Sequence, residues 1–176
     1  MHILSGKFQR RLLKFPKDRS FRPTKGIVRE SVFNIIGGCI EDALFLDLCS
    51  GSGALGFEAE SRGAAHVVCV DRHIKYLLDN KAQLSAQAEI IRLDIVRYLK
   101  MTSDAFDIIY LDPVWSDQEV YIRGIELIFE REVLKPNGLL MVEHQSSFDI
   151  SYTFSKWYAS SYQYGQSMLS LFKHTQ

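Results

Sequence analysis

The chain has 176 residues, of which 47% are hydrophobic and 24% are charged, a composition typical of one soluble globular domain. No apolar run approaches the roughly 20 residues that a membrane helix needs, and the first residues contain no apolar stretch long enough for a signal peptide. The sequence therefore argues against a membrane or secreted protein, and we expect a cytoplasmic one.

The charge is unevenly distributed although its total is zero. Residues 1–30 hold nine Lys or Arg and two acids, a net charge of +7, which leaves −7 for the remainder. Because clustered cations attract phosphate groups, this basic arm predicts a phosphate-binding element. The alternative is a solvated N-terminus with no binding role.

Metal ligands are not expected. The three cysteines, Cys39, Cys49 and Cys69, have no short spacing, and the five histidines form no ligand pattern. Since Cys49 and Cys69 lie in apolar runs, buried free thiols are the simplest interpretation. We expect neither a metal nor a disulfide framework.

The first third of the chain predicts a hairpin and a helix. Alternating segments at residues 2–5 and 11–15 flank Gly6 and favour a small hairpin. A broad apolar face indicates a helix over residues 23–38, with Thr24 as its N-cap and Gly37-Gly38 at its end.

Strands and helices then alternate. Strands are expected at residues 44–49, 66–70, 89–93, 106–111 and 138–143. Helices are expected at about 54–62, 73–86, 95–101 and 118–132. This order predicts parallel βαβ units with right-handed crossovers.

The last segment departs from this rhythm. Two β-rich runs, residues 155–163 and 167–173, flank Tyr164-Gly165-Gln166 and predict an antiparallel hairpin. A mostly parallel sheet that ends in such a hairpin resembles the fold of the S-adenosylmethionine-dependent methyltransferases. A nicotinamide dehydrogenase would continue with parallel units instead.

A candidate cofactor site follows the first strand. Residues 51–56, GSGALG, match the pattern G-x-G-x-x-G, which is weak evidence alone because several cofactor classes use such loops. Asp71 ends the second strand, where it could accept ribose hydroxyl protons, and Asp94 ends the third, where it could accept an adenine amino proton. Each could instead be a helix N-cap, and Asp47, a fourth candidate, could be a helix or loop cap. The candidate cofactor-binding residues are Asp47, Gly51, Gly53, Asp71 and Asp94.

A candidate reaction centre follows the fourth strand, where Asp112, Pro113, Val114 and Trp115 are consecutive. The lone pair of an exocyclic base amine is delocalised, so the nitrogen must be held in line with the methyl group that it attacks. The Asp112 carboxylate and the Pro113 carbonyl could each accept one N–H, and Trp115 could stack on the base. A strand-ending turn is the alternative.

Several motifs together make the chain similar to the bacterial 16S ribosomal RNA guanine-N2 methyltransferases. The resemblance runs almost from end to end. It is carried by Ile3–Phe8, Arg22-Pro23-Thr24, Val28-Arg29-Glu30, Phe33-Asn34, Asp47–Gly56, Ser61–Ala64, Val142-Glu143-His144, Tyr164-Gly165 and Leu169–Phe172.

The resemblance implies a single domain over residues 1–176, with a basic arm at 1–22 and a catalytic core at 23–176. It implies a seven-stranded sheet, S-adenosylmethionine as methyl donor, S-adenosylhomocysteine as product, and guanine N2 of 16S RNA as target. It also places the segment from Arg22 to Asn34, with Thr24, near the cofactor and the base. The residues expected to contact RNA are Lys7, Arg10, Arg11, Arg22 and Arg29. We expect a monomer that acts on a small-subunit assembly particle.

Three positions depart from the family pattern. Val114 stands where the family has a second proline, with Trp115 as the aromatic. Ile27 stands where the family commonly has Arg, which removes one possible phosphate contact. The segment from Asp79 to Glu89 is short.

Other functions remain open from the sequence. A methyltransferase that acts on another amino group, such as adenine N6, would share the Asp-Pro signature. A nicotinamide oxidoreductase would leave that signature unused. A non-catalytic RNA-binding or ribosome-assembly factor could retain the fold.

Overall fold

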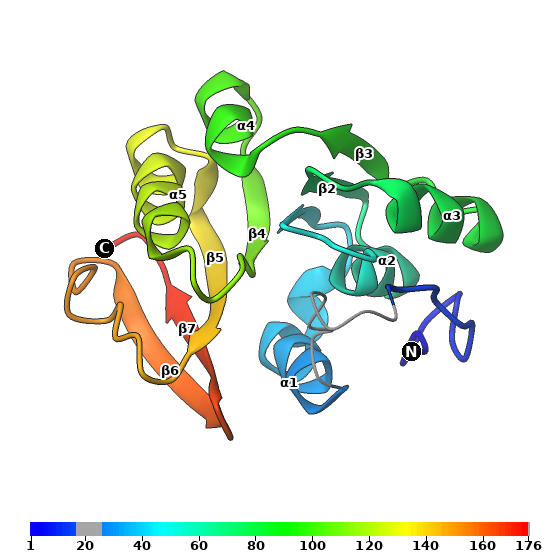
Figure 1. Cartoon of the computed structure of the whole chain (residues 1–176), viewed down its shortest axis with the longest axis horizontal. Helices are drawn as coiled ribbons and strands as arrows, with labels where there is room; N and C mark the ends of the chain where they lie inside the picture. Colours follow the sequence, from blue (N-terminus) through cyan, green and yellow to red (C-terminus); the bar gives the residue numbers. More distant parts are fainter. Residues whose placement is uncertain (17–25, 176) are drawn as a thin grey trace.

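One twisted sheet runs through the molecule in the computed structural model, which describes residues 1–16 and 26–175 (Figure 1). In the described part the sheet has seven strands, in the order β3-β2-β1-β4-β5-β7-β6. The strands are β1 (Leu44–Leu48), β2 (His66–Asp71), β3 (Glu89–Arg92), β4 (Phe106–Leu111), β5 (Leu134–Gln145), β6 (Tyr158–Tyr164) and β7 (Ser167–Phe172).

The strand directions confirm the predicted fold class. The strands from β3 to β5 pair in parallel, whereas β7 pairs antiparallel with both β5 and β6. The chain order changes direction between β1 and β4, and in α/β sheets a crevice opens outside the carboxyl ends of the strands at such a point. The result is a Rossmann-like, mostly parallel sheet that ends in an antiparallel hairpin.

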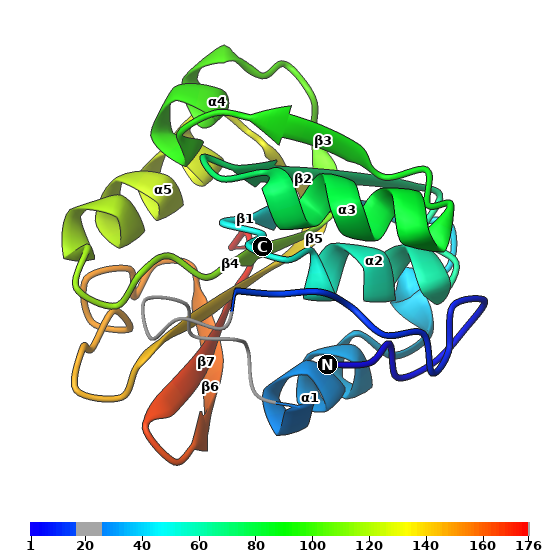
Figure 2. The ribbon, with the colours of Figure 1, turned by 45° about the vertical axis from the view of Figure 1, so that its right-hand side comes forward.

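Helices cover both faces of this sheet (Figures 1 and 2). One core packs α1, α2 and α3 against side chains such as Phe45 of β1. The other packs α4 and α5 against Leu46 and Leu48 of the same strand, as the alternation of a strand requires. The helices are α1 (Gly26–Ile36), α2 (Ala54–Ser61), α3 (Lys75–Leu84), α4 (Ile95–Met101) and α5 (Gln118–Glu130), with the short 3-10 helix η1 (Gly37–Ile40) after α1.

The elements lie where the sequence predicts them, with differences at their ends. Strand β5 begins at Leu134 rather than at residue 138, because Leu134 pairs with Phe106 across a register irregularity that the apolar pattern does not reveal. Strand β6 begins at Tyr158 rather than at residue 155. The predicted N-cap of the first helix, Thr24, lies outside the described residues.

The predicted N-terminal hairpin is present as a short pairing. His2 and Leu12 form an isolated antiparallel bridge, and the backbone N–H of Ile3 donates to the carbonyl of Arg11 at 3.0 Å.

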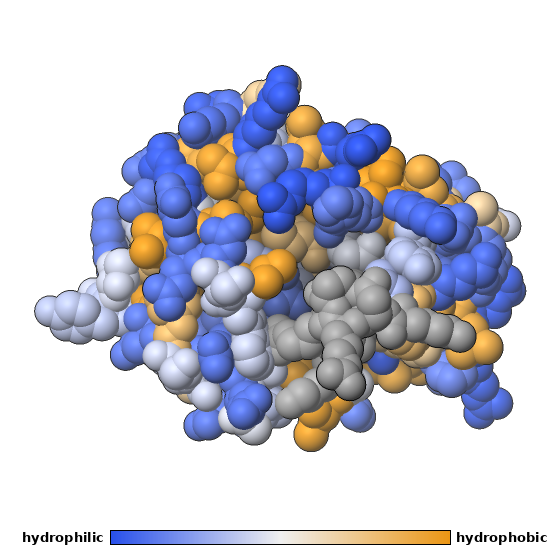
Figure 3. Space-filling model, in the orientation of Figure 1, coloured by the Kyte–Doolittle hydropathy of each residue, from blue (hydrophilic) through white to orange (hydrophobic). Residues whose placement is uncertain are grey.

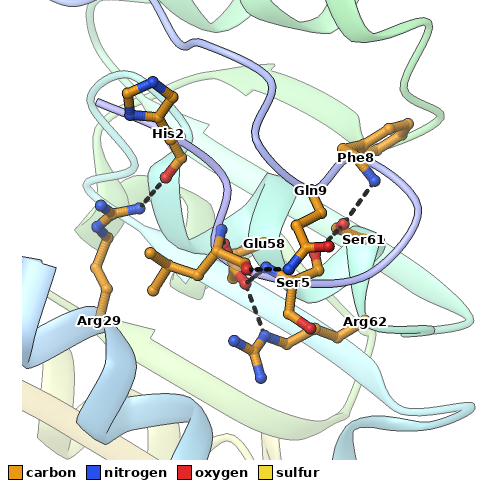
Figure 4. Close-up of polar contacts among 9 residues, drawn as sticks. His2, Ser5, Phe8, Gln9, Arg29, Glu58, Ser61 and Arg62 are labelled. Atoms are coloured by element: carbon orange, nitrogen blue, oxygen red, sulfur yellow. Dashed lines mark hydrogen bonds and ion pairs between the residues drawn. The ribbon is translucent and has the colours of Figure 1, made fainter.

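The N-terminal segment, residues 1–16, is fastened to α2 (Figure 4). The buried carboxylate of Glu58 accepts the backbone N–H groups of Leu4 at 2.6 Å and Ser5 at 3.0 Å. The hydroxyl oxygen of Ser61 accepts the N–H of Phe8 at 2.9 Å. Gly6 lies so close to Ser61 that an added Cβ would stand 1.7 Å from its carbonyl oxygen. The segment is therefore packed against the body of the protein.

Candidate active site

A tight loop joins β1 to α2. Its backbone takes left-handed conformations at Cys49 (φ 63°), Gly51 (φ 57°) and Gly53 (φ 80°). A Cβ at Gly53 would stand 2.4 Å from the ring of Phe57, so the sequence needs glycine there for space as well as for conformation.

Asp71 holds this loop at the end of β2. Its Oδ2 accepts the N–H of Gly51 at 2.8 Å, and its Oδ1 accepts the N–H of His73 at 2.7 Å. A carboxylate oxygen has more than one acceptor site, so each oxygen can take a further donor from a ligand.

Asp94 and Asp47 make the capping contacts that the sequence left open. Asp94 is the N-cap of α4, where its Oδ1 accepts the N–H groups of Val96 at 3.0 Å and Arg97 at 3.3 Å. Its Oδ2 accepts no hydrogen bond from residues 1–16 or 26–175. Asp47 is buried, and its Oδ2 accepts the N–H of Gly56 in the first turn of α2 at 2.9 Å.

The environment of Asp47 favours its neutral form. Burial raises its pKa to about 7, and the charge of Asp71 acts in the same direction. The hydrogen bonds from Gly56 and Ser50 lower the pKa but do not offset burial. Asp47 therefore titrates near neutrality.

The Asp112–Trp115 segment follows β4 directly. The N–H of Asp112 donates to the carbonyl of Leu48 at 3.3 Å, which ties the segment to β1. The Pro113 carbonyl oxygen lies 2.9 Å from the hydroxyl oxygen of Tyr121. Trp115 is half-buried against the α4–α5 core, whereas Val114 is 64% exposed.

A cavity of about 740 Å³ lies along the carboxyl ends of β1, β2, β3 and β4, where the switch in strand order predicts one. Figure 3 shows this face of the molecule hollowed near its centre, with many hydrophilic side chains around it. The cavity wall includes seven of the predicted site residues: Asp47, Gly51, Asp71, Asp94, Asp112, Pro113 and Trp115. Gly53 shapes the loop without forming part of this wall.

Other lining residues were missed by sequence reasoning. Tyr110 could have been found, because it is two residues before Asp112 and side chains two apart in a strand share a face; in the structure it is paired with Asp47. Arg72, His73 and Lys75, which follow β2, also line the cavity. Nothing in their spacing distinguishes them from an ordinary polar turn.

The residues predicted to contact RNA do not line the cavity where the structure describes them. Lys7 Nζ lies 3.0 Å from Glu60 Oε1, and Arg11 donates to the carbonyl of Gln83 at 2.8 Å. Arg29 is only 4% exposed and donates to the carbonyl of His2 at 2.9 Å. Arg10 is exposed.

Two predicted residues, Arg22 and Thr24, lie outside the described residues. The RNA-binding and cofactor-binding roles given to all of these side chains stay predictions.

Within residues 1–16 and 26–175, no group of three or more His, Cys, Asp or Glu side chains could hold a metal ion. No helix there is long and apolar enough to cross a membrane.

Comparison with known proteins places these features in a family. The family model Conserved hypothetical protein 95 matches residues 1–173. YlbH of Bacillus subtilis (strain 168), described provisionally as an rRNA methyltransferase, is 35% identical over 161 residues, which cover 87% of each chain. Ribosomal RNA small subunit methyltransferase D of Escherichia coli (strain K12) is 32% identical over 149 residues, which cover 82% of this chain and 75% of the relative. The solved structure of yhhF from Escherichia coli, described provisionally as a methyltransferase, matches with a TM-score of 0.88 and 28% identity over 100% of this chain and 99% of the other.

Proposed function

The chain belongs to this rRNA methyltransferase family, and on that premise we propose that it transfers a methyl group from S-adenosylmethionine to RNA of the small ribosomal subunit. The target that we propose is the exocyclic N2 of a guanine. The observation that carries the proposal is the convergence of a glycine loop, Asp71, Asp94 and the Asp112-Pro113 pair on one cavity.

The lining of the cavity fits the proposed methyl donor. A volume of about 740 Å³ is in the range of small-molecule sites. Asp71 would accept ribose hydroxyl protons, and Oδ2 of Asp94 would accept an adenine amino proton. The wall holds five aspartates against Arg72 and Lys75, and this excess of acids favours a ligand that carries positive charge, as the sulfonium and ammonium groups of S-adenosylmethionine do.

The bound donor would supply an electrophilic methyl group, and the chain would position the nucleophile. Asp112 and the Pro113 carbonyl would each accept one N–H of the base amine, which directs its nitrogen at the methyl carbon. The new N–C bond forms as the S–C bond breaks, and the amine then loses a proton to water. Orientation of this kind contributes roughly 7–11 kcal/mol in well-ordered systems.

The RNA base must leave its stack to reach this cavity. Trp115 is half-buried against the α4–α5 core, and its role as a stacking platform stays a prediction. The exposed side chain of Val114 lines the cavity beside it.

Substitution of Asp112 tests the proposal. Small ribosomal subunits from cells that lack this protein would be incubated with the purified protein and methyl-labelled S-adenosylmethionine. We expect label in the RNA, and we expect Asp112→Ala to lower the transfer rate by on the order of 10²–10³-fold, as loss of one pre-oriented hydrogen-bonding group does.

Cofactor affinity, measured by calorimetry, should change little in this variant. Substantial transfer by Asp112→Ala would show that the catalytic residue is wrongly assigned. Loss of cofactor binding in the variant would point to a role in the donor site instead.

A further inference from the structure

A hydrogen-bonded chain of buried groups lies behind the Pro113 carbonyl. Tyr121 of α5 is 0% exposed. Its hydroxyl oxygen stands 2.9 Å from the Pro113 carbonyl oxygen and 3.0 Å from the Glu143 carbonyl oxygen. The hydroxyl has one proton, which the two carbonyl oxygens share, and it thus connects α5, the segment after β4 and strand β5.

The side chain of Glu143 is held by a second hydrogen bond, separate from the one at its backbone carbonyl. This side chain is 0% exposed, and its Oε2 accepts the hydroxyl of Tyr110 at 2.7 Å. Burial and the nearby Glu143 carboxylate raise the pKa of Tyr110 well above its usual range, so this hydroxyl keeps its proton and donates. Tyr110 belongs to β4 and lines the cavity. The chain of contacts therefore begins and ends at the cavity wall.

The direction of the Pro113 carbonyl needs such a restraint. The ring of Pro113 fixes φ, but the direction of the carbonyl depends on ψ. A proline at the next position would restrict ψ of Pro113, whereas Val114 at that position imposes no such limit. The contact with Tyr121 engages one side of the carbonyl oxygen, which leaves its second lone pair for another donor.

We infer that Tyr121 is a positioning residue, which aims the Pro113 carbonyl at the amine of the target base, and that the backbone carbonyl of Glu143 anchors its hydroxyl. The inference rests on the proposed methyl transfer, in which the Pro113 carbonyl is one of the two acceptors of the amine N–H groups. Tyr121 itself does not form part of the cavity wall, so it acts through Pro113.

The variant Tyr121→Phe removes the hydroxyl and keeps the ring. We expect the single-turnover rate of methyl transfer to fall by at least about 10-fold, because small displacements of a positioning group are costly. The affinity for S-adenosylmethionine and the KM for small subunits should stay within about twofold. Tyr98→Phe is the matched control, because Tyr98 is also buried and its hydroxyl makes no hydrogen bond to Pro113 or Glu143. This control should transfer methyl groups at the normal rate.

A spectroscopic measurement reports on the carbonyl itself. The chain has four prolines, so proline labelled with ¹³C at the carbonyl gives few signals, and Pro113→Ala identifies that of Pro113. Tyr121→Phe should shift this signal, and Tyr98→Phe should leave it in place.

The outcomes separate the inference from the proposed function. A shifted carbonyl signal together with slowed transfer supports the positioning role. An unshifted signal, or a shifted signal with normal transfer, overturns it. If the unsubstituted protein labels no RNA, the proposed function fails, and with it the positioning role, before any variant is compared.

Discussion

At the scale of single residues, Asp47 is the most unusual group in the site. It is buried beneath the glycine loop and forms part of the cavity wall, and its Oδ2 accepts the N–H of Gly56. An enclosed carboxyl with a pKa of about 7 binds a proton in the folded state at pH values where the unfolded chain has lost it. The stability of the protein must then depend on pH through this residue.

We expect the free energy of unfolding to fall as pH rises from about 4 to about 7, because the folded state holds the extra proton in that window. The contribution of Asp47 is on the order of 4 kcal/mol, at 1.36 kcal/mol per pH unit. Asp47→Asn keeps an oxygen acceptor for Gly56 and cannot ionise. The free energy of unfolding of both proteins would be measured by urea denaturation at pH 4, 5.5 and 8. Relative to the unsubstituted protein, Asp47→Asn should become more stable as pH rises. A difference that is constant across pH would contradict this account of Asp47.

The sequence indicated which acids lie at the carboxyl ends of the strands, because strand ends are visible in the apolar pattern. It could not decide between capping and ligand binding for Asp47 and Asp94, since the same short side chain serves both. The contact between Tyr121 and Pro113 was not predictable, because the fold alone brings the two together.

At the scale of elements, the N-terminal segment is bound to α2 through one side of that helix. Glu58, Ser61 and Arg62 lie at this contact (Figure 4), and Arg62 Nε donates to Glu58 at 2.7 Å. The sequence predicted a hairpin around Gly6, but it gave no sign of the surface against which the hairpin packs. Helix α2 is short and buried along its whole length, so its apolar pattern does not distinguish its two sides.

Gly6→Ala tests the packing of this segment. The left-handed backbone at Gly6 (φ +78°) alone costs about 1–2 kcal/mol for a residue with a Cβ, and the contact with Ser61 adds to that cost. We therefore expect the free energy of unfolding to fall by more than about 2 kcal/mol, or the segment to detach and become sensitive to proteases.

Gly38→Ala is the control, because an added Cβ there meets nothing within 4 Å. Equal stability of both variants would show that the segment is not held as described.

At the scale of the whole molecule, the sequence predicted the order of helices and strands. It did not predict which positive charges make contacts within the fold. Alternating apolar runs specified the parallel units, and the short turn at Gly165 specified the closing hairpin. Residues 1–30 carry a net charge of +7, but Lys7 lies beside Glu60 and Arg29 is buried. Part of the positive charge is therefore used within the fold.

Neutralising the arm tests its role in RNA binding. Replacing Lys7, Arg10 and Arg11 by Gln should weaken the affinity for small-subunit RNA and leave cofactor affinity unchanged. If each cation contacts one phosphate, the slope of log K against log salt should decrease by about 2, at about 0.7 per contact on a single strand.

Three exposed cations elsewhere, Lys100, Arg131 and Lys173, give a matched control triple variant. An equal loss of RNA and cofactor binding in the arm variant would indicate disturbed folding and would reject the assignment. An equal effect of the control triple on RNA binding would reject it as well.

The central claim is that this cavity methylates guanine N2 in small-subunit RNA. The most direct measurement digests RNA from subunits labelled by the protein and identifies the labelled nucleoside. The account predicts label in N2-methylguanosine alone, at one position. Label in N6-methyladenosine, or no label although S-adenosylmethionine binds, would contradict it.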